Sequence, residues 1–412
     1  MKILQINCVY KRGSTGKITY DLHTALQEQG ETSVVCYGRG PKTKDPGVYK
    51  TCGELYGKWC NLRRRITGLM YGGCFFSTER LLHILRREKP DVVHLQCING
   101  YFVHIYRLIH WLKKNRIKTV LTLHAEFMYT ANCGIAMHCD RWRTGCGACP
   151  HRWEATQSLF FDRTAESWRR MQKAFSGFER DCVIVSVSDW LRLRAMQSPI
   201  FEHFRHETVW NGIDTHGAFH PTVSNLRNAS GIREDKLVLH VTAHFSAAAG
   251  HIKGGAYVIA LAKRMPDTAF VVLAARDEIP ADTVLPKNLY RPGSVNGPHR
   301  LAQWYTAADA VLLTSTRETL SMVTAESLCC GTPVVGFRAG GPESIAPEMY
   351  STFVEQGDTD ALQRALEDRL RTPFDRAKIA ETSCRKFDRA EMCARYGQIY
   401  RRLCAEKEGE NG

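Results

Sequence analysis

The 412-residue sequence lacks several features that define whole classes of protein. No apolar run approaches the ~20 residues that a transmembrane helix needs. The first residues, 1–8, lack the apolar core of a secretory signal and are predicted to form a β-strand. There is no low-complexity segment and no internal repeat beyond a two-fold recurrence of pattern, so a repeat architecture is excluded. We therefore expect a cytoplasmic protein whose membrane contact is peripheral, on the inner face of the cell membrane.

The length exceeds the size at which one hydrophobic core stops growing, so two domains are expected. Apolar residues make up 44% of the chain and charged residues 24%, as in ordinary globular proteins. The sixteen cysteines do not predict disulfides, because the chain is large and carries no visible export signal. Free thiols or a metal site are the expected alternatives.

The net charge of +14 is unevenly distributed along the chain. Residues 1–210 hold 32 Lys and Arg against 18 Asp and Glu, whereas residues 211–412 hold 24 of each. All of the excess positive charge therefore lies in the first half. An anionic partner for that half is expected, and a general solubility surface is the alternative.

Short apolar strands alternate with helical patterns in both halves, which predicts parallel sheets covered by helices. The predicted strands lie at 3–8, 33–37, 91–96, 119–124, 183–187, 237–243, 269–275, 310–314 and 333–337. The predicted helices lie at 17–29, 102–114, from about 189, and at 256–264, 301–308 and 321–330. A turn-rich segment at 210–214 suits a linker between the halves. The expected fold class is α/β, with two doubly wound Rossmann-like domains facing each other across a cleft that holds the ligands.

Two carboxylates stand near the start of the helix predicted at 321–330. Glu318 precedes this helix, and Glu326 lies inside it, before Gly331 ends it. The amino end of a helix offers free N–H groups that suit phosphates. Nearby carboxylates accept hydrogen bonds from sugar and ribose hydroxyls.

This Glu-x7-Glu arrangement resembles the signature of retaining glycosyltransferases with the GT-B fold, in the large family called family 4. The resemblance extends along nearly the whole chain in the family's order. The supporting matches are the loop 13–16, 90–94, 123–124, 187–188, 211–214, 252–254 and 340–343.

The resemblance implies a role for each matching residue. Glu326 would hold the ribose hydroxyls, and Glu318 the hydroxyls of the transferred sugar. Lys253 would neutralise the leaving diphosphate, which needs positive charge where negative charge develops. Gly16 would let the first loop approach the phosphates or the acceptor, and His124 would line the reaction centre. A solvated lysine and a hydrogen-bonded histidine at a strand end are the ordinary alternatives for Lys253 and His124.

Two departures from the family pattern concern the donor site. Members usually carry an Arg a few residues before the Lys, but the segment 243–253 contains none. His244 or His251 would substitute as a weaker phosphate partner. The usual Phe-Gly after the first Glu is replaced around Leu320 and Ser321, which are expected to contact the donor.

The resemblance further implies a hexosyltransferase that uses a UDP-, GDP- or ADP-sugar and retains the anomeric configuration without a catalytic metal. Its domains would be an acceptor-side domain at 1–208, a donor domain at 209–388, and a last helix at 389–412 that crosses back. The acceptor would be a saccharide, lipid-linked, in the biosynthesis of a surface polysaccharide. A nucleotide-sugar epimerase or hydrolase on the same fold is the alternative.

Four cysteines lie close together between 133 and 149. Cys133, Cys139, Cys146 and Cys149 suit a tetrahedral structural zinc, and free thiols or disulfides are the alternatives. The same spacing resembles a subgroup that includes colanic-acid-type exopolysaccharide enzymes. A zinc-dependent nucleic-acid-binding protein would also explain the cysteines and the basic charge. It would not explain two α/β halves, so no nucleic acid partner is expected.

A basic amphipathic segment covers 59–70. Trp59, Leu62, Ile66 and Leu69 share one helical face, and the three arginines at 63–65 lie off it. Such helices are typical of membrane surfaces, so an anionic membrane is an expected partner. A domain helix with a solvated basic edge is the alternative.

Overall fold

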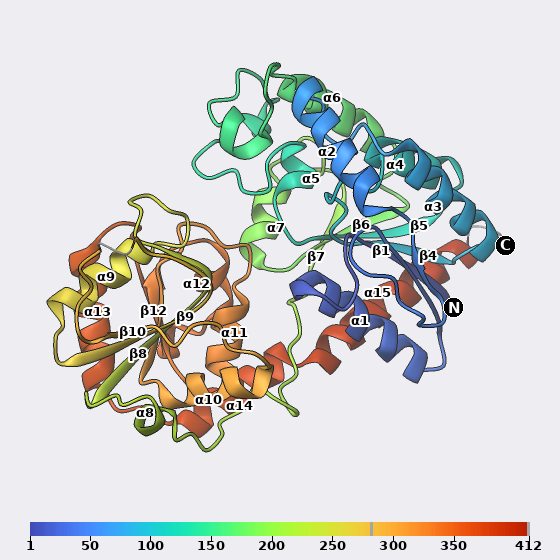
Figure 1. Cartoon of the computed structure of the whole chain (residues 1–412). Helices are drawn as coiled ribbons and strands as arrows, with labels where there is room; N and C mark the ends of the chain where they lie inside the picture. The colour runs from blue at the N-terminus through green and yellow to red at the C-terminus, as the bar shows by residue number, and fades with distance from the viewer. Residues whose placement is uncertain (281–282, 410–412) are drawn as a thin grey trace. The chain divides into compact units, whose positions relative to one another are not determined.

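The computed structural model describes residues 1–280 and 283–409, which form two compact units (Figure 1). Unit 1 comprises Met1–Trp210 and Met392–Gly412, and unit 2 comprises Asn211–Glu391. Each unit is an α/β structure built on one parallel sheet. No helix in the described ranges is both long enough and apolar enough to span a bilayer.

The sheet of unit 1 has seven parallel strands in the order β3-β2-β1-β4-β5-β6-β7. Its direction of winding reverses at β1, which makes the unit doubly wound, as predicted. The strands are β1 Lys2–Asn7, β2 Thr32–Tyr37, β3 Val48–Lys50, β4 Val92–Leu95, β5 Lys118–Leu123, β6 Cys182–Ser186 and β7 Arg205–Thr208. The helices are α1 Gly13–Glu28, α2 Glu54–Thr67, α3 Phe75–Glu88, α4 Ile105–Lys114, α5 Phe127–Thr130, α6 Thr164–Phe175, α7 Asp189–Ala195 and the short turns η1 Arg141–Arg143 and η2 Arg152–Thr156.

The sheet of unit 2 has six parallel strands in the order β10-β9-β8-β11-β12-β13 and is also doubly wound. The strands are β8 Lys236–Ser246, β9 Thr268–Glu278, β10 Leu289–Tyr290, β11 Ala310–Leu313, β12 Val334–Phe337 and β13 Ser351–Val354. The helices are α8 Leu226–Ala229, α9 Gly255–Arg264, α10 Pro298–Ala307, α11 Met322–Cys329, α12 Gly341–Ile345, α13 Thr359–Arg371, α14 Arg376–Phe387 and the turn η3 Glu348–Tyr350.

Two of the predicted boundaries that were wrong have a clear local reason. Residues 13–16 form the first turn of α1 and not a loop, because the carbonyl of Gly16 accepts from the Lys11 amide at 3.0 Å and folds the chain back. The helix predicted at 102–114 begins at Ile105, since Nδ1 of His104 accepts from the Arg107 amide at 3.3 Å and caps it.

The last helix, α15 (Arg389–Gly409), packs on the sheet of unit 1 (Figure 1). Its buried side chains Met392, Tyr396, Ile399, Tyr400 and Leu403 share a core with strands β1, β4, β5 and β6. The contact has a polar centre at His94, which is fully buried on β4. The His94 ring lies 2.7 Å from both the Tyr400 and the Thr122 hydroxyls, and Thr122 in turn lies 2.8 Å from Tyr396.

The buried His94 predicts acid sensitivity of unit 1. Burial lowers the pKa of His94 to about 3, whereas an unfolded histidine titrates near 6.5. Between these values the unfolded state binds more protons, so stability falls as the pH falls, by up to roughly 1.4 kcal/mol per pH unit. The free energy of unfolding in urea is measured from pH 7 to pH 4. Its slope against pH should show that His94→Asn takes up about one proton fewer on unfolding than the unsubstituted chain.

The control for this experiment is His203→Asn, because His203 is a surface residue with 79% of its side chain exposed. It should leave the pH dependence of unfolding unchanged. An equal slope in His94→Asn and in the unsubstituted chain would contradict the prediction.

Candidate functional site

Two loops of unit 2 are held together at the carboxyl ends of β8 and β11. The Thr316 amide donates to the carbonyl of Ile252 at 2.8 Å, and the Thr314 hydroxyl donates to the carbonyl of Lys253 at 2.9 Å. Gly254 has a φ of +65°, and a Cβ there would lie 2.1 Å from the carbonyl oxygen of Thr314. Only glycine permits this approach, so the sequence Lys253-Gly254 is what lets the two loops join.

Joining the loops brings Lys253 and Glu318 into contact. The Lys253 Nζ lies 2.5 Å from Oε1 of Glu318, although the residues are 65 positions apart. Both side chains are only partly buried, with 29% and 24% exposed, so the pair is open to solvent and to a ligand. An open ion pair of this kind is weak, and a more highly charged anion can displace the carboxylate.

The Glu318 backbone is fixed from its other side by the segment 340–343. Glu318 accepts from the Gly341 amide at 2.8 Å and donates to the carbonyl of Ala339 at 3.0 Å. A Cβ on Gly341 would lie 2.5 Å from the Leu320 amide nitrogen, so this approach also requires glycine. The Glu343 carboxylate accepts from the amides of Ala339 and Gly340 at 3.0 and 2.8 Å. Glu318 is thereby positioned by backbone contacts.

Glu326 lies in the second turn of α11. The hydroxyl of Tyr305, a fully buried residue of α10, donates to Oε2 of Glu326 at 2.9 Å. This hydrogen bond orients a partly exposed carboxylate. The pKa of Tyr305 is raised by burial and by the Glu326 charge, which keeps its hydroxyl protonated as the donor.

Leu320 and Ser321, both predicted to contact the donor, are buried beneath this surface. Ser321 has a φ of +79° and caps α11, since its hydroxyl accepts from the Thr324 amide at 3.2 Å. These side chains shape the entry to α11.

His244 lies at the end of β8 and pairs with Glu278 of β9 at 2.8 Å. Its ring packs edge-on against His251 at a centroid distance of 4.6 Å. Nδ1 of His251 accepts from the Lys253 amide at 3.3 Å. The pKa of His251 is lowered by its burial and by His244. The two histidines thus support the Lys253 loop, and His244 is engaged by a carboxylate.

Gly16 and His124, the other two predicted site residues, lie in unit 1. Gly16 is in the first turn of α1, where a Cβ would lie 3.1 Å from Val9 Cγ2. The N-cap residue of α1, Arg12, provides no side-chain cap. His124 directly follows β5. Burial lowers the pKa of His124 to about 4, so its imidazole is neutral at physiological pH. Both residues lie beyond the carboxyl ends of parallel strands, where ligands bind in doubly wound sheets.

The cysteine cluster does not match the predicted zinc site. Cys133, Cys139, Cys146 and Cys149 line one small cavity and form no disulfide. Yet within 1–280 and 283–409 no three His, Cys, Asp or Glu side chains are arranged to hold a metal ion. Cys146 instead donates to the Thr130 carbonyl at 3.6 Å, and burial raises the pKa of Cys133 and Cys146 to about 12. Because no three ligand side chains come together in the described residues, this arrangement does not support the zinc prediction.

Three supporting residues were not predicted from the sequence. Tyr305 contacts Glu326 and Glu278 contacts His244, whereas Glu343 bonds the amides of Ala339 and Gly340 in the segment that fixes the Glu318 backbone. Glu343 belongs to the matched segment 340–343, but the pattern carries no signal for what it bonds. Tyr305 and Glu278 lie in an ordinary helix and strand, and only the folded structure brings them to the site.

Two family models match the chain. The model described as Glycosyltransferase Family 4 matches residues 15–216, and the model described as Glycosyl transferases group 1 matches residues 255–372. The first match lies largely in unit 1, and the second lies wholly in unit 2.

Similar proteins include two curated relatives and a solved structure. WcaC of Escherichia coli (strain K12), whose name assigns it to colanic acid biosynthesis as a glycosyl transferase, is 25% identical over 164 residues, or 36% of this chain and 40% of WcaC. The N-acetyl-alpha-D-glucosaminyl L-malate synthase of Bacillus anthracis is 27% identical over 238 residues, or 54% of this chain and 60% of the synthase. The structure of Alr3699/HepE of Anabaena in complex with UDP has a TM-score of 0.67 at 16% identity. The match covers 97% of this chain and 99% of the HepE chain.

The chain therefore spans less than two thirds of the length of these curated relatives, while the structural likeness extends over nearly all of it. The two parallel, doubly wound units and the two matching models confirm the predicted fold and family. The chain belongs to the glycosyltransferases of the GT-B fold, with a Family 4 domain followed by a group 1 domain.

Proposed function

We propose that the chain transfers a hexose from a nucleotide diphosphate sugar, bound in unit 2, to a saccharide acceptor. The observation that carries the proposal is the grouping of Lys253, Glu318 and Glu326 around the start of α11. One lysine and two carboxylates match the two chemical parts of such a donor, an anionic diphosphate and a set of hydroxyls.

The Lys253–Glu318 pair suggests how donor binding begins. A diphosphate carries more negative charge than a carboxylate, so it can draw Lys253 away from Glu318. Glu318 would then be released to accept hydrogen bonds from the sugar hydroxyls. As the bond between sugar and diphosphate breaks, charge grows on the diphosphate, and Lys253 stabilises that charge most strongly.

The donor is proposed to be a UDP-sugar, with GDP- and ADP-sugars as alternatives. Support comes from HepE, whose structures contain UDP and, in another crystal, UDP-glucose. We further propose reaction with retention of the anomeric configuration. In that reaction the incoming hydroxyl attacks the anomeric carbon from the same face from which the diphosphate departs.

Glu326→Ala is the test of the donor site. Without the carboxylate, the ribose hydroxyls lose a charged acceptor, so UDP affinity should fall by about 1.5–3 kcal/mol, or roughly 10- to 150-fold. Calorimetry with UDP measures it. Glu348→Ala, an exposed surface glutamate of the same unit, is the control and should leave the affinity unchanged. Unchanged UDP affinity in Glu326→Ala would show that Glu326 does not bind the ribose. Analysis of the products formed from UDP-sugars would distinguish transfer from hydrolysis or epimerisation.

We also propose that the acceptor is lipid-linked and belongs to surface polysaccharide biosynthesis, with unit 1 held at the inner face of the cell membrane. Helix α2 supports this, because its apolar side faces outward: Leu55, Trp59, Leu62 and Ile66 have between 42% and 81% of their surface exposed. Phe76 of α3, 81% exposed, extends this surface through its contact with Tyr56. We call these five residues the α2 apolar surface.

The predicted arrangement of α2 needs two corrections. The helix ends at Thr67, and Gly68 with a φ of +70° caps it, so Leu69 does not continue the apolar face. Arg64 lies on the buried face of α2, so only Arg63 and Arg65 of the three arginines remain near the solvent. An exposed apolar stripe on a unit that carries the chain's excess positive charge is suited to an anionic bilayer.

Trp59→Ser combined with Leu62→Ser should weaken binding to phosphatidylcholine vesicles containing phosphatidylglycerol at least about tenfold, because each side chain contributes roughly 1.5–3 kcal/mol when buried. Cosedimentation measures it, and added salt should release the unsubstituted chain. Val223→Ser with Met349→Ser, two exposed apolar residues of unit 2, is the matched control. Equal binding by both double variants would contradict a role for the α2 apolar surface.

A further inference from the structure

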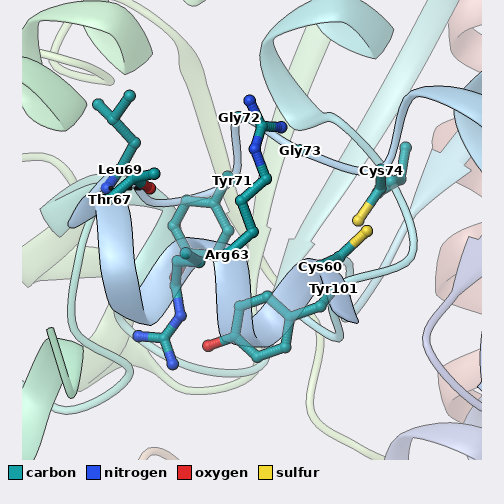
Figure 2. A pocket seen from close by; sticks show the side chains of 11 residues that line it. Cys60, Arg63, Thr67, Leu69, Tyr71, Gly72, Gly73, Cys74 and Tyr101 are labelled. Carbon is teal, nitrogen blue, oxygen red and sulfur yellow. Dashed lines mark hydrogen bonds between the residues drawn. The ribbon is translucent and has the colours of Figure 1, made fainter. Parts of the chain in front are cut away.

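A small hollow lies in unit 1 beside the carboxyl end of α2 (Figure 2). Its walls are the last turns of α2, the segment 69–74, and two residues that follow β4. The lining side chains that could meet a ligand are Arg63, Arg64, Tyr71, Tyr101, Cys60 and Cys74. The site described above does not use this hollow.

The charge of the hollow is positive. It is lined by two arginines and by no Asp or Glu. Burial raises the pKa of Tyr71, Tyr101 and Cys74, so these groups stay neutral and add no negative charge. In Figure 2 the side chains of Cys60 and Cys74 turn their sulfur atoms toward each other.

Arg64 is a buried cation without a counter-ion among the described residues. Only 5% of it is exposed. Its guanidinium donates to the carbonyl of Thr156, to Oδ1 of Asn61 at 2.8 Å and to Oε1 of Gln157 at 3.5 Å, and it lies 4.9 Å above the Tyr101 ring. All of these partners are neutral, and Nε has no hydrogen-bond partner.

An uncompensated buried charge is costly, because removing it from water is not balanced by attraction to an opposite charge. Burial accordingly lowers the pKa of Arg64, and the positive charge of Arg65 lowers it further. A bound anion would supply the missing negative charge. An anion in the hollow would therefore offset part of the cost of burying Arg64.

Arg63 supplies a second, accessible cation at the same hollow. It is exposed and lies 5.8 Å from the centre of the Phe75 ring, and among residues 1–280 and 283–409 it forms no ion pair. A Cβ placed on Gly73 would lie 3.9 Å from its Nη1, so its guanidinium reaches across the glycine pair Gly72–Gly73 (Figure 2). Two guanidinium groups at one hollow suit a phosphate or diphosphate, which carries about two negative charges and several acceptor oxygens.

The hollow also lies at the end of the sheet where ligands are expected. Tyr101 follows β4, and the hydroxyl of Tyr71 donates to the carbonyl of Asn132, in the segment after β5, at 3.2 Å. His124 follows the same strand. The carboxyl ends of these two neighbouring strands are the usual binding edge of a doubly wound sheet.

We propose that the hollow beside Arg63 and Arg64 binds a phosphate or diphosphate group carried by the acceptor, an assignment that rests on the proposed function. Arg63 and the Tyr101 hydroxyl would donate to the phosphate oxygens, and Arg64 would provide the buried positive charge behind them. The acceptor is thus a phosphorylated molecule and not a neutral sugar.

The test uses the full chain with UDP at saturation, so that the donor site in unit 2 is filled. Pyrophosphate is then titrated by calorimetry. Saturable binding is expected, weakened at least tenfold in Arg63→Gln and unchanged in Lys58→Gln, which removes an exposed charge from the same helix outside the hollow. Tyr101→Phe, which keeps the ring over Arg64, should weaken binding to a smaller extent.

No second binding event, or equal affinities in Arg63→Gln and Lys58→Gln, would overturn the assignment while leaving the proposed function intact. A failure of UDP itself to bind would instead count against the proposed function. Vesicles of phosphatidylcholine with phosphatidic acid separate the two sources of phosphate. Release of the chain from them by pyrophosphate assigns the hollow to a lipid-borne phosphate, and saturable pyrophosphate binding without release assigns it to a soluble phosphorylated acceptor.

Discussion

Lys253→Ala is expected to lower kcat by about 100- to 1000-fold, the range found when one donor to a developing negative charge is removed. The loss should be smaller in UDP affinity than in kcat, because the diphosphate gains most of its charge as it leaves. Steady-state kinetics with a UDP-sugar and calorimetry with UDP measure the two effects separately.

Lys263→Ala is the matched control for this experiment. Lys263 is an exposed lysine of the same unit, in the last turn of α9. The kcat and the UDP affinity of Lys263→Ala should equal those of the unsubstituted chain. If Lys253→Ala retained kcat within about threefold, another cation would be neutralising the diphosphate, and His251 beside the loop would be the next residue to test.

Gly254→Ala is expected to abolish the joining of the two donor loops. A Cβ at this position would lie 2.1 Å from the Thr314 carbonyl oxygen, so the loops must separate. The Thr314–Lys253 hydrogen bond would be lost, and Lys253 would leave Glu318. Together with the strain of a positive φ, we expect a loss of about 3 kcal/mol in the stability of unit 2 and loss of measurable UDP binding.

Gly250→Ala isolates the effect of backbone strain alone. Gly250 lies on the same loop with a φ of +79°, but a Cβ there would have no atom within 4 Å. Its replacement should cost only roughly 1–2 kcal/mol and leave UDP binding intact. Urea unfolding and calorimetry compare the two variants. Equal effects in both would show that the approach to Thr314 is unimportant.

Alternating and continuous apolar patterns predicted most strands to within one or two residues, because buried parallel strands leave a clear signal. Helix α3 was not predicted, since its N-cap residue Cys74 has a φ of 65° and offers no side-chain cap. The edge strands β3 and β10 are only three and two residues long, too short for any period to be recognised.

The site residues were named from their pattern, but their contacts could not be. The sequence pattern identifies Lys253 and Glu318 as site residues without showing that they touch. The 2.5 Å between Lys253 Nζ and Glu318 Oε1 depends on hydrogen bonds from Thr314 and Thr316. The buried face of α2 was likewise not predictable. Its inward residues include Gly57 and Arg64, while Trp59 lies outside, which reverses the usual rule.

The position of α15 has a consequence for the order in which the chain folds. Synthesis proceeds from the amino end, and the core of unit 1 includes Tyr396, Tyr400 and Leu403 from the last helix. All residues of unit 2, which ends at Glu391, are synthesised before those side chains. Unit 1 must therefore wait, with only α1 to cover this part of its sheet, while the residues of unit 2 are added. A nascent chain stalled before residue 392 would expose the part of the sheet that α15 covers to chaperones and proteases.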